Sequence, residues 1–160
     1  MLENNLTFDE LSMLDAFKST IENAFSTSSW YNLFGKKKPR IYYSLTEARQ
    51  NTAFPCFVIT MSSTPAQGLV NSSQVEQYSS VIITIEQFNQ EVGTNGKERL
   101  GIMINHELKK VLQETYKVKI ISNNELLNID STIYRRQIIC SIIFDNKNQI
   151  IYQGDSYYGY

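Results

Sequence analysis

Apolar positions recur along this chain with two different periods, which predict two helices and several strands. In Phe8–Phe25 and again in Asn95–Thr115 they recur at steps of three and four, as on one face of an amphipathic helix. In Tyr78–Phe88 they alternate with polar residues, as in a strand with one solvated face. The apolar side of this strand contains Val81, Ile83 and Ile85.

Each helix has an apolar stripe and a start signal. Thr7 with Glu10, and Asn95 with Glu98, have the spacing of a capping box at the two helix starts. The first stripe consists of Phe8, Leu11, Leu14, Phe17, Ile21 and Phe25, and the Ser/Thr run after it ends the helix. The second stripe consists of Leu100, Met103, Ile104, Leu108, Val111 and Leu112.

Other segments predict further strands and the connections between them. Arg40–Tyr43 is short and aromatic, and Pro55 opens an apolar strand that ends at Met61, with Phe57 and Ile59 on the same face as Met61. Lys117–Ile121 predicts a short strand, Thr132–Asp145 predicts a long one, and Ile150–Tyr152 pairs briefly. Trp30–Arg40 is expected to be a connector, Ser62–Gln77 a long polar loop, and Glu125–Ile129 is ambiguous.

The order of these elements predicts an α+β fold with a mixed, largely antiparallel sheet and helices packed on one face. With 160 residues, the chain has the size of a single domain spanning 1–160, with a flexible C-terminal tail at 153–160. The expected core is the sheet face with Phe57, Ile59, Val81, Ile83 and Ile85, together with the run Ile138–Phe144, under both helix stripes.

The amino-acid composition and net charge of the chain indicate which classes of partner to expect. The net charge of −1 argues against nucleic acid as the main partner, since such proteins usually carry a basic excess. Ten tyrosines suit surfaces that become buried on assembly, and they also suit half-exposed strands. Cys56 and Cys140 lie in apolar runs and are expected to be buried free thiols. The first residues lack a signal-peptide pattern and no run is long enough to cross a bilayer, so we expect a soluble protein made in a reducing cytoplasm.

No arrangement of residues predicts catalysis. Gly93-Thr94-Asn95-Gly96-Lys97 lies between a strand and a helix, but Glu91 and Glu98 replace the glycine and the hydroxyl residue of a phosphate loop, so a turn and helix start explain it. His106 is the single histidine and lies on the polar side of its helix. The acids Glu47, Glu76, Glu86 and Asp130 are scattered, and the chain has no G-x-S-x-G motif. We expect a protein that is not an enzyme, with no cofactor and no metal.

Two basic features are candidates for contacts. Three interpretations fit the basic run Lys36-Lys37-Lys38-Pro39-Arg40. It is a solvated connector, an arm that binds nucleic acid, or a segment that docks to an acidic face of a neighbouring protein. Arg135 and Arg136 lie in succession in the last long strand, so one of them faces the packed side and needs a partner within the chain or at a subunit boundary.

The order of elements resembles that of tail terminators and related head-tail joining proteins of long-tailed bacteriophages. The likeness extends over nearly the whole chain as an order of elements, without strong family-specific residues: a first helix, an extended segment, a loop that ends at Phe54-Pro55 before an apolar strand, a long alternating strand, a helix and a late long strand. The matching segments are Phe8–Phe25, Arg40–Tyr43, Phe54–Met61, Tyr78–Phe88, Asn95–Thr115 and Thr132–Asp145.

This resemblance implies a non-enzymatic virion protein, a subunit of a homo-oligomeric ring, commonly a hexamer, that caps the tail tube and forms the docking surface for the head. The implied partners are other copies of the chain, the tail tube protein and a head-completion or connector protein, with DNA only passing through the ring and no membrane. Alternatives are a head-completion or minor capsid subunit, and a soluble nucleic-acid-binding module. The expected interface residues are Lys36, Lys37, Lys38, Arg40, Gln67, Gly68, Asn71, Arg135, Arg136, Tyr157, Tyr158 and Tyr160.

Overall fold

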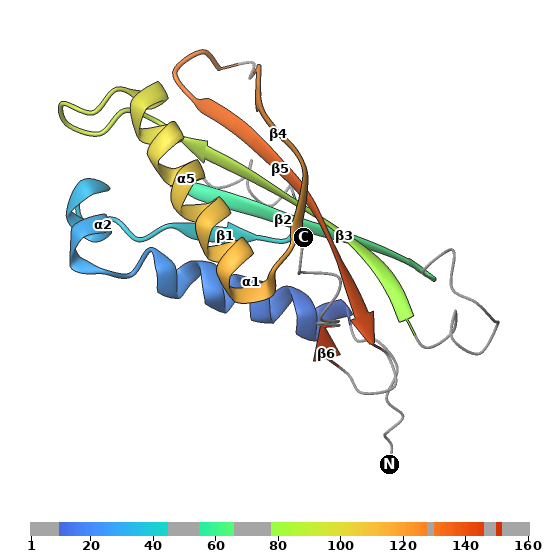
Figure 1. Ribbon diagram of the computed structural model, residues 1–160. Coiled ribbons are helices and arrows are strands. Elements are labelled where there is room, and N and C mark those ends of the chain that lie inside the picture. The colour runs from blue at the N-terminus through green and yellow to red at the C-terminus, as the bar shows by residue number, and fades with distance from the viewer. Residues whose placement is uncertain (1–9, 45–54, 66–77, 128–129, 146–149, 152–160) are drawn as a thin grey trace.

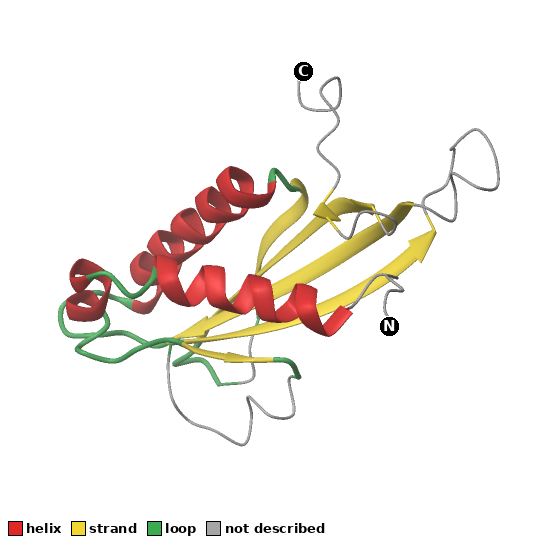
Figure 2. Ribbon diagram, turned by 90° about the horizontal axis from the view of Figure 1, so that it is seen from below, coloured by secondary structure: helices red, strands yellow, loops and turns green. Residues whose placement is uncertain are grey.

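A single twisted sheet forms the centre of the fold, and the helices lie on one of its faces (Figures 1 and 2). The computed structural model describes residues 10–44, 55–65, 78–127, 130–145 and 150–151. Its elements in chain order are α1 (Glu10–Ala24), α2 (Ser28–Leu33), β1 (Arg40–Tyr42), β2 (Cys56–Pro65), β3 (Tyr78–Asn89), α5 (Lys97–Tyr116), β4 (Lys119–Leu126), β5 (Tyr134–Asp145) and β6 (Ile150–Ile151).

The strands are ordered β1-β2-β3-β5-β4, and β6 pairs with the end of β5. Only β1 and β2 run parallel, while all the other neighbours are antiparallel. Helix α1 contacts β2, and α5 contacts β3 and β5. The α+β class, with a mixed, largely antiparallel sheet and helices packed on one face, is therefore confirmed.

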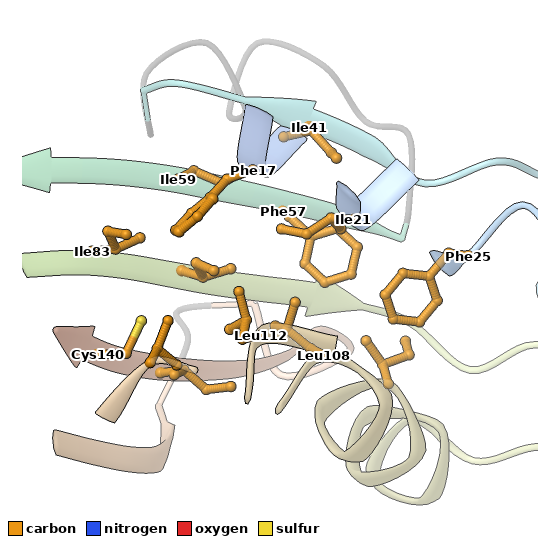
Figure 3. Close-up of a cluster of buried hydrophobic side chains, with 14 of the residues drawn as sticks. Phe17, Ile21, Phe25, Ile41, Phe57, Ile59, Ile83, Leu108, Leu112 and Cys140 are labelled. Carbon is orange, nitrogen blue, oxygen red and sulfur yellow. The ribbon is translucent and has the colours of Figure 1, made fainter. Parts of the chain in front are cut away.

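The core fills the space between the sheet and the two long helices (Figure 3). Alternate residues of β2, β3 and β5 point into this space, because successive strand residues face opposite sides of a sheet. The expected core residues of β2 and β3 are confirmed there. Fully or almost fully buried side chains from the sheet are Phe57, Ile59, Val81, Ile83, Ile85, Ile138, Cys140, Ile142 and Phe144.

Two details of the predicted core were wrong. The run Ile138–Phe144 does not lie in the core as a whole, since Ile139 and Ile143 point to the face without helices. On α1, Leu11 is 59% exposed and Met13 is buried instead. Met13 is in line with the buried residues one and two turns later, and Leu11 lies about 200° away from it around the helix.

Three element boundaries also differ from the sequence-based expectation. Helix α2 lies where a plain connector was expected from Trp30, because its six residues are too few to show a period. Strand β4 is longer than expected and includes Asn123, Asn124 and Glu125, whose polar composition hides a strand. Strand β2 continues to Pro65, so the expected loop from Ser62 begins later, and its residues 66–77 lie outside the described part.

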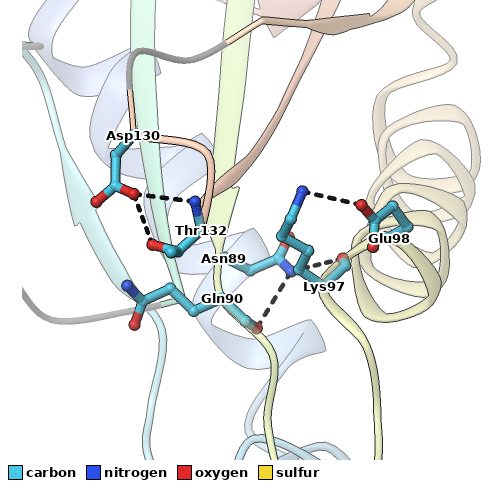
Figure 4. Close-up of polar contacts among 6 residues, drawn as sticks. All are labelled: Asn89, Gln90, Lys97, Glu98, Asp130 and Thr132. Carbon is cyan, nitrogen blue, oxygen red and sulfur yellow. Dashed lines mark hydrogen bonds and ion pairs between the residues drawn. The ribbon is translucent and has the colours of Figure 1, made fainter.

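The start of α5 was also predicted wrongly. Its N-cap is Gly96, with no side-chain capping bond, whereas a capping box from Asn95 to Glu98 was expected. The backbone of Asn95 is instead bonded to that of Val92 in both directions, with N···O distances of 2.9 and 3.0 Å. This tight turn places Asn95 before the helix, and Lys97 forms an ion pair with Glu98 (Figure 4). The other expected capping box includes Thr7, which lies outside the described residues.

Helix α5 approaches the sheet closely at Gly101. A Cβ atom at this position would lie 2.2 Å from Cδ1 of Tyr134, whose ring is buried beneath the helix. Two amide side chains of β3 bind the helix at the same place. Gln87 Nε2 donates to the Gly101 carbonyl over 2.8 Å, and Asn89 Nδ2 donates to the Lys97 carbonyl over 3.0 Å. The first half of α5 is therefore fixed by polar contacts as well as by its apolar stripe.

Candidate interaction surface

The sheet face opposite the helices carries a patch of three half-buried isoleucines. Ile82 on β3 pairs with Ser141 on β5, so its diagonal neighbours on β5 are Ile139 and Ile143. We call these three side chains the isoleucine patch. The neighbouring positions on this face are hydroxyl residues, namely Thr60, Ser62, Ser80, Thr84, Ser122 and Ser141. The charged residues described on this half of the face are Lys119, which pairs with Ser141, and the buried Asp145, two residues after Ile143 on β5.

The sequence contains a signal for this patch in pairs of adjacent isoleucines. Adjacent isoleucines occur at Ile82-Ile83, Ile138-Ile139 and Ile142-Ile143. Neighbouring strand residues point to opposite faces, so an apolar pair places one side chain on each face. Only the alternation of β3 entered the expectation, which assigned the whole apolar content to one side.

The other half of this face, near β1, holds a small apolar cluster. Cys56, Val58 and Phe88 are buried there, and the partly buried Tyr42 and Ile133 pack against them. Burial raises the pKa of the Cys56 thiol to about 12, and that of the Cys140 thiol in the main core to about 12. Both thiols are free, as expected, and their burial in neutral form makes them poor nucleophiles.

A polar cluster separates the two halves of the face. Arg135 Nε and NH2 donate to Glu86 Oε1 over 3.1 and 2.9 Å, and Gln137 Nε2 donates to Glu86 Oε2 over 2.9 Å. The Arg135 guanidinium also lies 5.6 Å from the centre of the Phe88 ring. Glu86 thus has its charge balanced within the chain. Both oxygens of Glu86 accept hydrogen bonds from side chains of the same sheet, which favours a structural role for this residue.

The two successive arginines lie on opposite faces of β5. Arg136 is on the helix side, where its Nε donates to Asn123 Oδ1 over 2.9 Å and its NH1 donates to the Tyr134 hydroxyl over 3.0 Å. Asn123 Nδ2 in turn donates to Asn105 Oδ1 over 2.9 Å. Arg136 therefore has its partners within the same chain. Arg135, the other predicted interface residue, also has them there.

The basic run lies at the surface between α2 and β1. Lys36, Lys37, Lys38 and Arg40 are all exposed, while Pro39 is buried. Gly35 and Lys36 have φ values of 70° and 65°, and their N–H groups cap the end of α2. The other predicted interface residues, Gln67, Gly68, Asn71, Tyr157, Tyr158 and Tyr160, lie outside the described residues.

An open depression of about 550 Å³ lies between α2 and the turn that precedes α5. Its lining carries no charged side chain and consists of Ser29, Asn32, Leu33, Gly35, Val92, Gly93, Thr94 and Asn95. Catalytic pockets usually hold a titratable side chain or an activated nucleophile, and the described lining of this depression has no charged group that could activate one.

Other candidates for chemistry are also explained by local structure. His106 is exposed on the outer side of α5. Asp130 accepts hydrogen bonds from the Thr132 N–H and hydroxyl, which lower the pKa of its carboxyl (Figure 4). Within the described ranges, no three His, Cys, Asp or Glu side chains gather as a metal site. Glu47 and Glu76 lie outside those ranges.

Comparisons with known proteins add no family to this description. A scan against protein-family models finds no match, and a search of curated proteins finds no significant relative. None of the described helices is both long and apolar enough to span a membrane.

Proposed function

We propose that this chain is a non-enzymatic structural subunit of a bacteriophage virion that assembles into a ring at the head-proximal end of the tail. In this proposal it resembles the tail terminators, caps the tail tube and offers a docking surface to the head. The observation that carries the proposal is the one-sided fold: helices cover one face of the sheet, and the other face presents the isoleucine patch among uncharged hydroxyl residues.

The composition of this face supports a protein partner. The centres of protein interfaces are depleted of charged residues, and the isoleucine patch with its surrounding Ser and Thr side chains has this character. A nucleic acid would need several cations facing its phosphates, and Lys119 is the single cation beside the patch among the described residues. Covering the patch removes apolar surface from water, which is the main favourable term in association.

The order of elements also supports the proposal. A first helix, a short extended strand, a long pair of strands, a helix on the sheet and a late long strand follow one another as in the tail terminators. The half-buried Glu86 carboxylate is balanced by Arg135 and Gln137, which supports a structural role for it. A head-completion or minor capsid subunit would use the same architecture and remains the alternative within this class.

The second class is a nucleic-acid-binding module, favoured by the exposed Lys36, Lys37, Lys38 and Arg40. Mass measurement in solution separates the two classes. The ring proposal predicts a stable particle whose mass is an integral multiple of 18.5 kDa and which binds the tube protein encoded in the same gene cluster. A monomer that shifts on short duplex DNA, and loses the shift when the three lysines become Gln, would instead support the nucleic-acid module.

The isoleucine patch gives the proposal a residue-level test. Ile139→Glu places a charge within the patch and should prevent binding of the tube protein. Ile139→Val keeps the position apolar and should bind as the wild type does. Equal binding of both variants would show that this face is not a contact surface.

A further inference from the structure

Beyond the end of β1, no described residue pairs with the outer edge of β2. β1 pairs with β2 only at Cys56–Val58, although β2 continues in regular register with β3 as far as Pro65. The Arg40 N–H donates to the Pro55 carbonyl over 3.1 Å, so the odd-numbered residues of β2 direct their backbone groups toward β1.

The same alternation continues beyond the end of β1. The Ile59 N–H still faces the Tyr42 carbonyl at the last β1–β2 pair. The Ile59 C=O and the N–H and C=O groups of Met61 and Ser63 point outward, and no described residue pairs with them. We call this stretch, residues 59–64, the free β2 edge. Unpaired groups on a strand edge form a template on which another strand can add.

The free β2 edge lacks the features with which proteins usually protect such a template. Charged side chains, an internal proline or a bulge normally prevent a second strand from adding. This stretch reads Ile-Thr-Met-Ser-Ser-Thr, with neither charge nor proline, and its register with β3 shows no shift. Thr60 and Ser62 are exposed on the helix-free face beside it.

The opposite edge of the sheet is formed by β4. β4 pairs with β5 on one side, and no described strand pairs with its other side. A register shift between Ile120 and Ser122 makes Ile121 protrude, and a regular stretch follows from Ser122 to Leu126. Ile121 is 53% exposed and Leu127 is 94% exposed, so two large apolar side chains flank this regular stretch.

We propose that β4 of one copy adds to the free β2 edge of the next copy, so that the sheet continues from subunit to subunit. The two stretches have similar lengths, since Ser122–Leu126 would lie along residues 59–64. Addition would satisfy the free backbone groups of both strands and bring Ile121 and Leu127 against the neighbour.

The two edges are different, so the contact is heterologous and repeats around a rotation axis to close a ring. The inference rests on the proposed ring and specifies the lateral contact between its subunits. It leaves the isoleucine patch for a partner along the ring axis. Pairing of two identical β2 edges would give a closed dimer instead, and the test distinguishes the two arrangements.

The first variant removes one outward N–H from the β2 edge. Ser63→Pro abolishes this donor and leaves the β2–β3 ladder intact, because the Ser63 N–H does not face β3. Ser63→Ala is the matched control, since it keeps the N–H. Sedimentation velocity should show assembly of Ser63→Ala at wild-type concentrations, and a rise of about tenfold or more in the concentration that Ser63→Pro needs.

The second variant acts on the other edge. Ile121→Lys places a charge on a side chain that is exposed in the single chain, so its folding should be unchanged while assembly is lost. Ile121→Val is the matched control and should assemble. An equimolar mixture of Ser63→Pro and Ile121→Lys should contain a dimer that neither variant forms alone, because each supplies the edge that the other lacks.

The outcomes separate this inference from the proposed function. Wild-type rings that persist in both Ser63→Pro and Ile121→Lys would overturn the edge contact and leave the ring standing. Dimers of Ile121→Lys alone would overturn it in favour of paired β2 edges, and a monomeric wild-type chain would overturn both proposals. If Ser63→Pro does not fold, hydrogen exchange decides. The Met61 and Ser63 amides should exchange more slowly in the wild-type assembly than in Ile121→Lys, and equal rates would overturn the contact.

Discussion

Replacing Gly101 by Ala should destabilise the protein, although alanine is the better helix former. The added Cβ would lie 2.2 Å from Cδ1 and 2.3 Å from Cε1 of Tyr134, far inside contact distance. The Tyr134 ring is 2% exposed, and its hydroxyl accepts a hydrogen bond from Arg136, so it has little room to move. Helix α5 would therefore have to shift away from β5.

The two opposing effects have known sizes. Alanine in place of glycine within a helix gains about 1 kcal/mol, and overpacking a core costs about 1–3 kcal/mol. A contact this short, with a ring held on all sides, belongs at the upper end of that range or above it. We expect a net loss of about 2 kcal/mol or more, which lowers the melting temperature by at least roughly 4–8 °C for a domain of this size.

Thermal unfolding followed by circular dichroism measures this effect. Gln113→Ala, an exposed change on the same helix, is the control and should stay within about 0.5 kcal/mol of wild type. Tyr134→Val removes the contacting ring atoms, so Gly101→Ala should cost less in its presence than in the wild-type chain. Wild-type stability of Gly101→Ala, or an equal cost in both backgrounds, would refute the close approach of α5 to β5.

Three further predictions concern the core and the polar cluster. Ile83→Ala and Leu108→Ala should each lower the unfolding free energy by about 2–5 kcal/mol, because both side chains are almost fully buried, and unchanged denaturation midpoints would show that the core is misplaced. Glu86→Leu should cost about 1–3 kcal/mol by leaving Arg135 and Gln137 without their acceptor, whereas Glu125→Leu at the exposed edge should cost little. Burial raises the pKa of both thiols to about 12, so the folded state favours the neutral form and stability should fall as the pH rises from about 9 toward 12. That fall should shrink in Cys140→Ala, and neither thiol should react with a disulfide reagent at pH 8 until the chain unfolds.

The sequence predicts those features of the fold that depend on local periodicity. The alternation of Val81, Ile83 and Ile85 is enough to identify a strand and its buried face. The stripe from Leu100 to Leu112 is enough to identify a helix that packs on one side. Both features are visible within a single window of the chain, which is why they were predicted correctly.

Features that depend on the pairing of segments far apart in the chain cannot be predicted from a short stretch of sequence. Glu86 and Arg135 meet only because β3 and β5 are neighbours in the register that places Phe88 beside Arg135. Strand β4 was underestimated because Asn123 and Asn124 disfavour strands, and it exists through its pairing with β5. The free β2 edge likewise follows from the short length of β1, which no local pattern of β2 reveals.

Electron microscopy of the purified wild-type chain tests the central claim most directly. The account predicts ring-shaped particles with rotational symmetry, whose mass is an integral multiple of 18.5 kDa. These rings should be absent from Ile121→Lys and present in Ile121→Val. A chain that remains a folded monomer at all concentrations would contradict it.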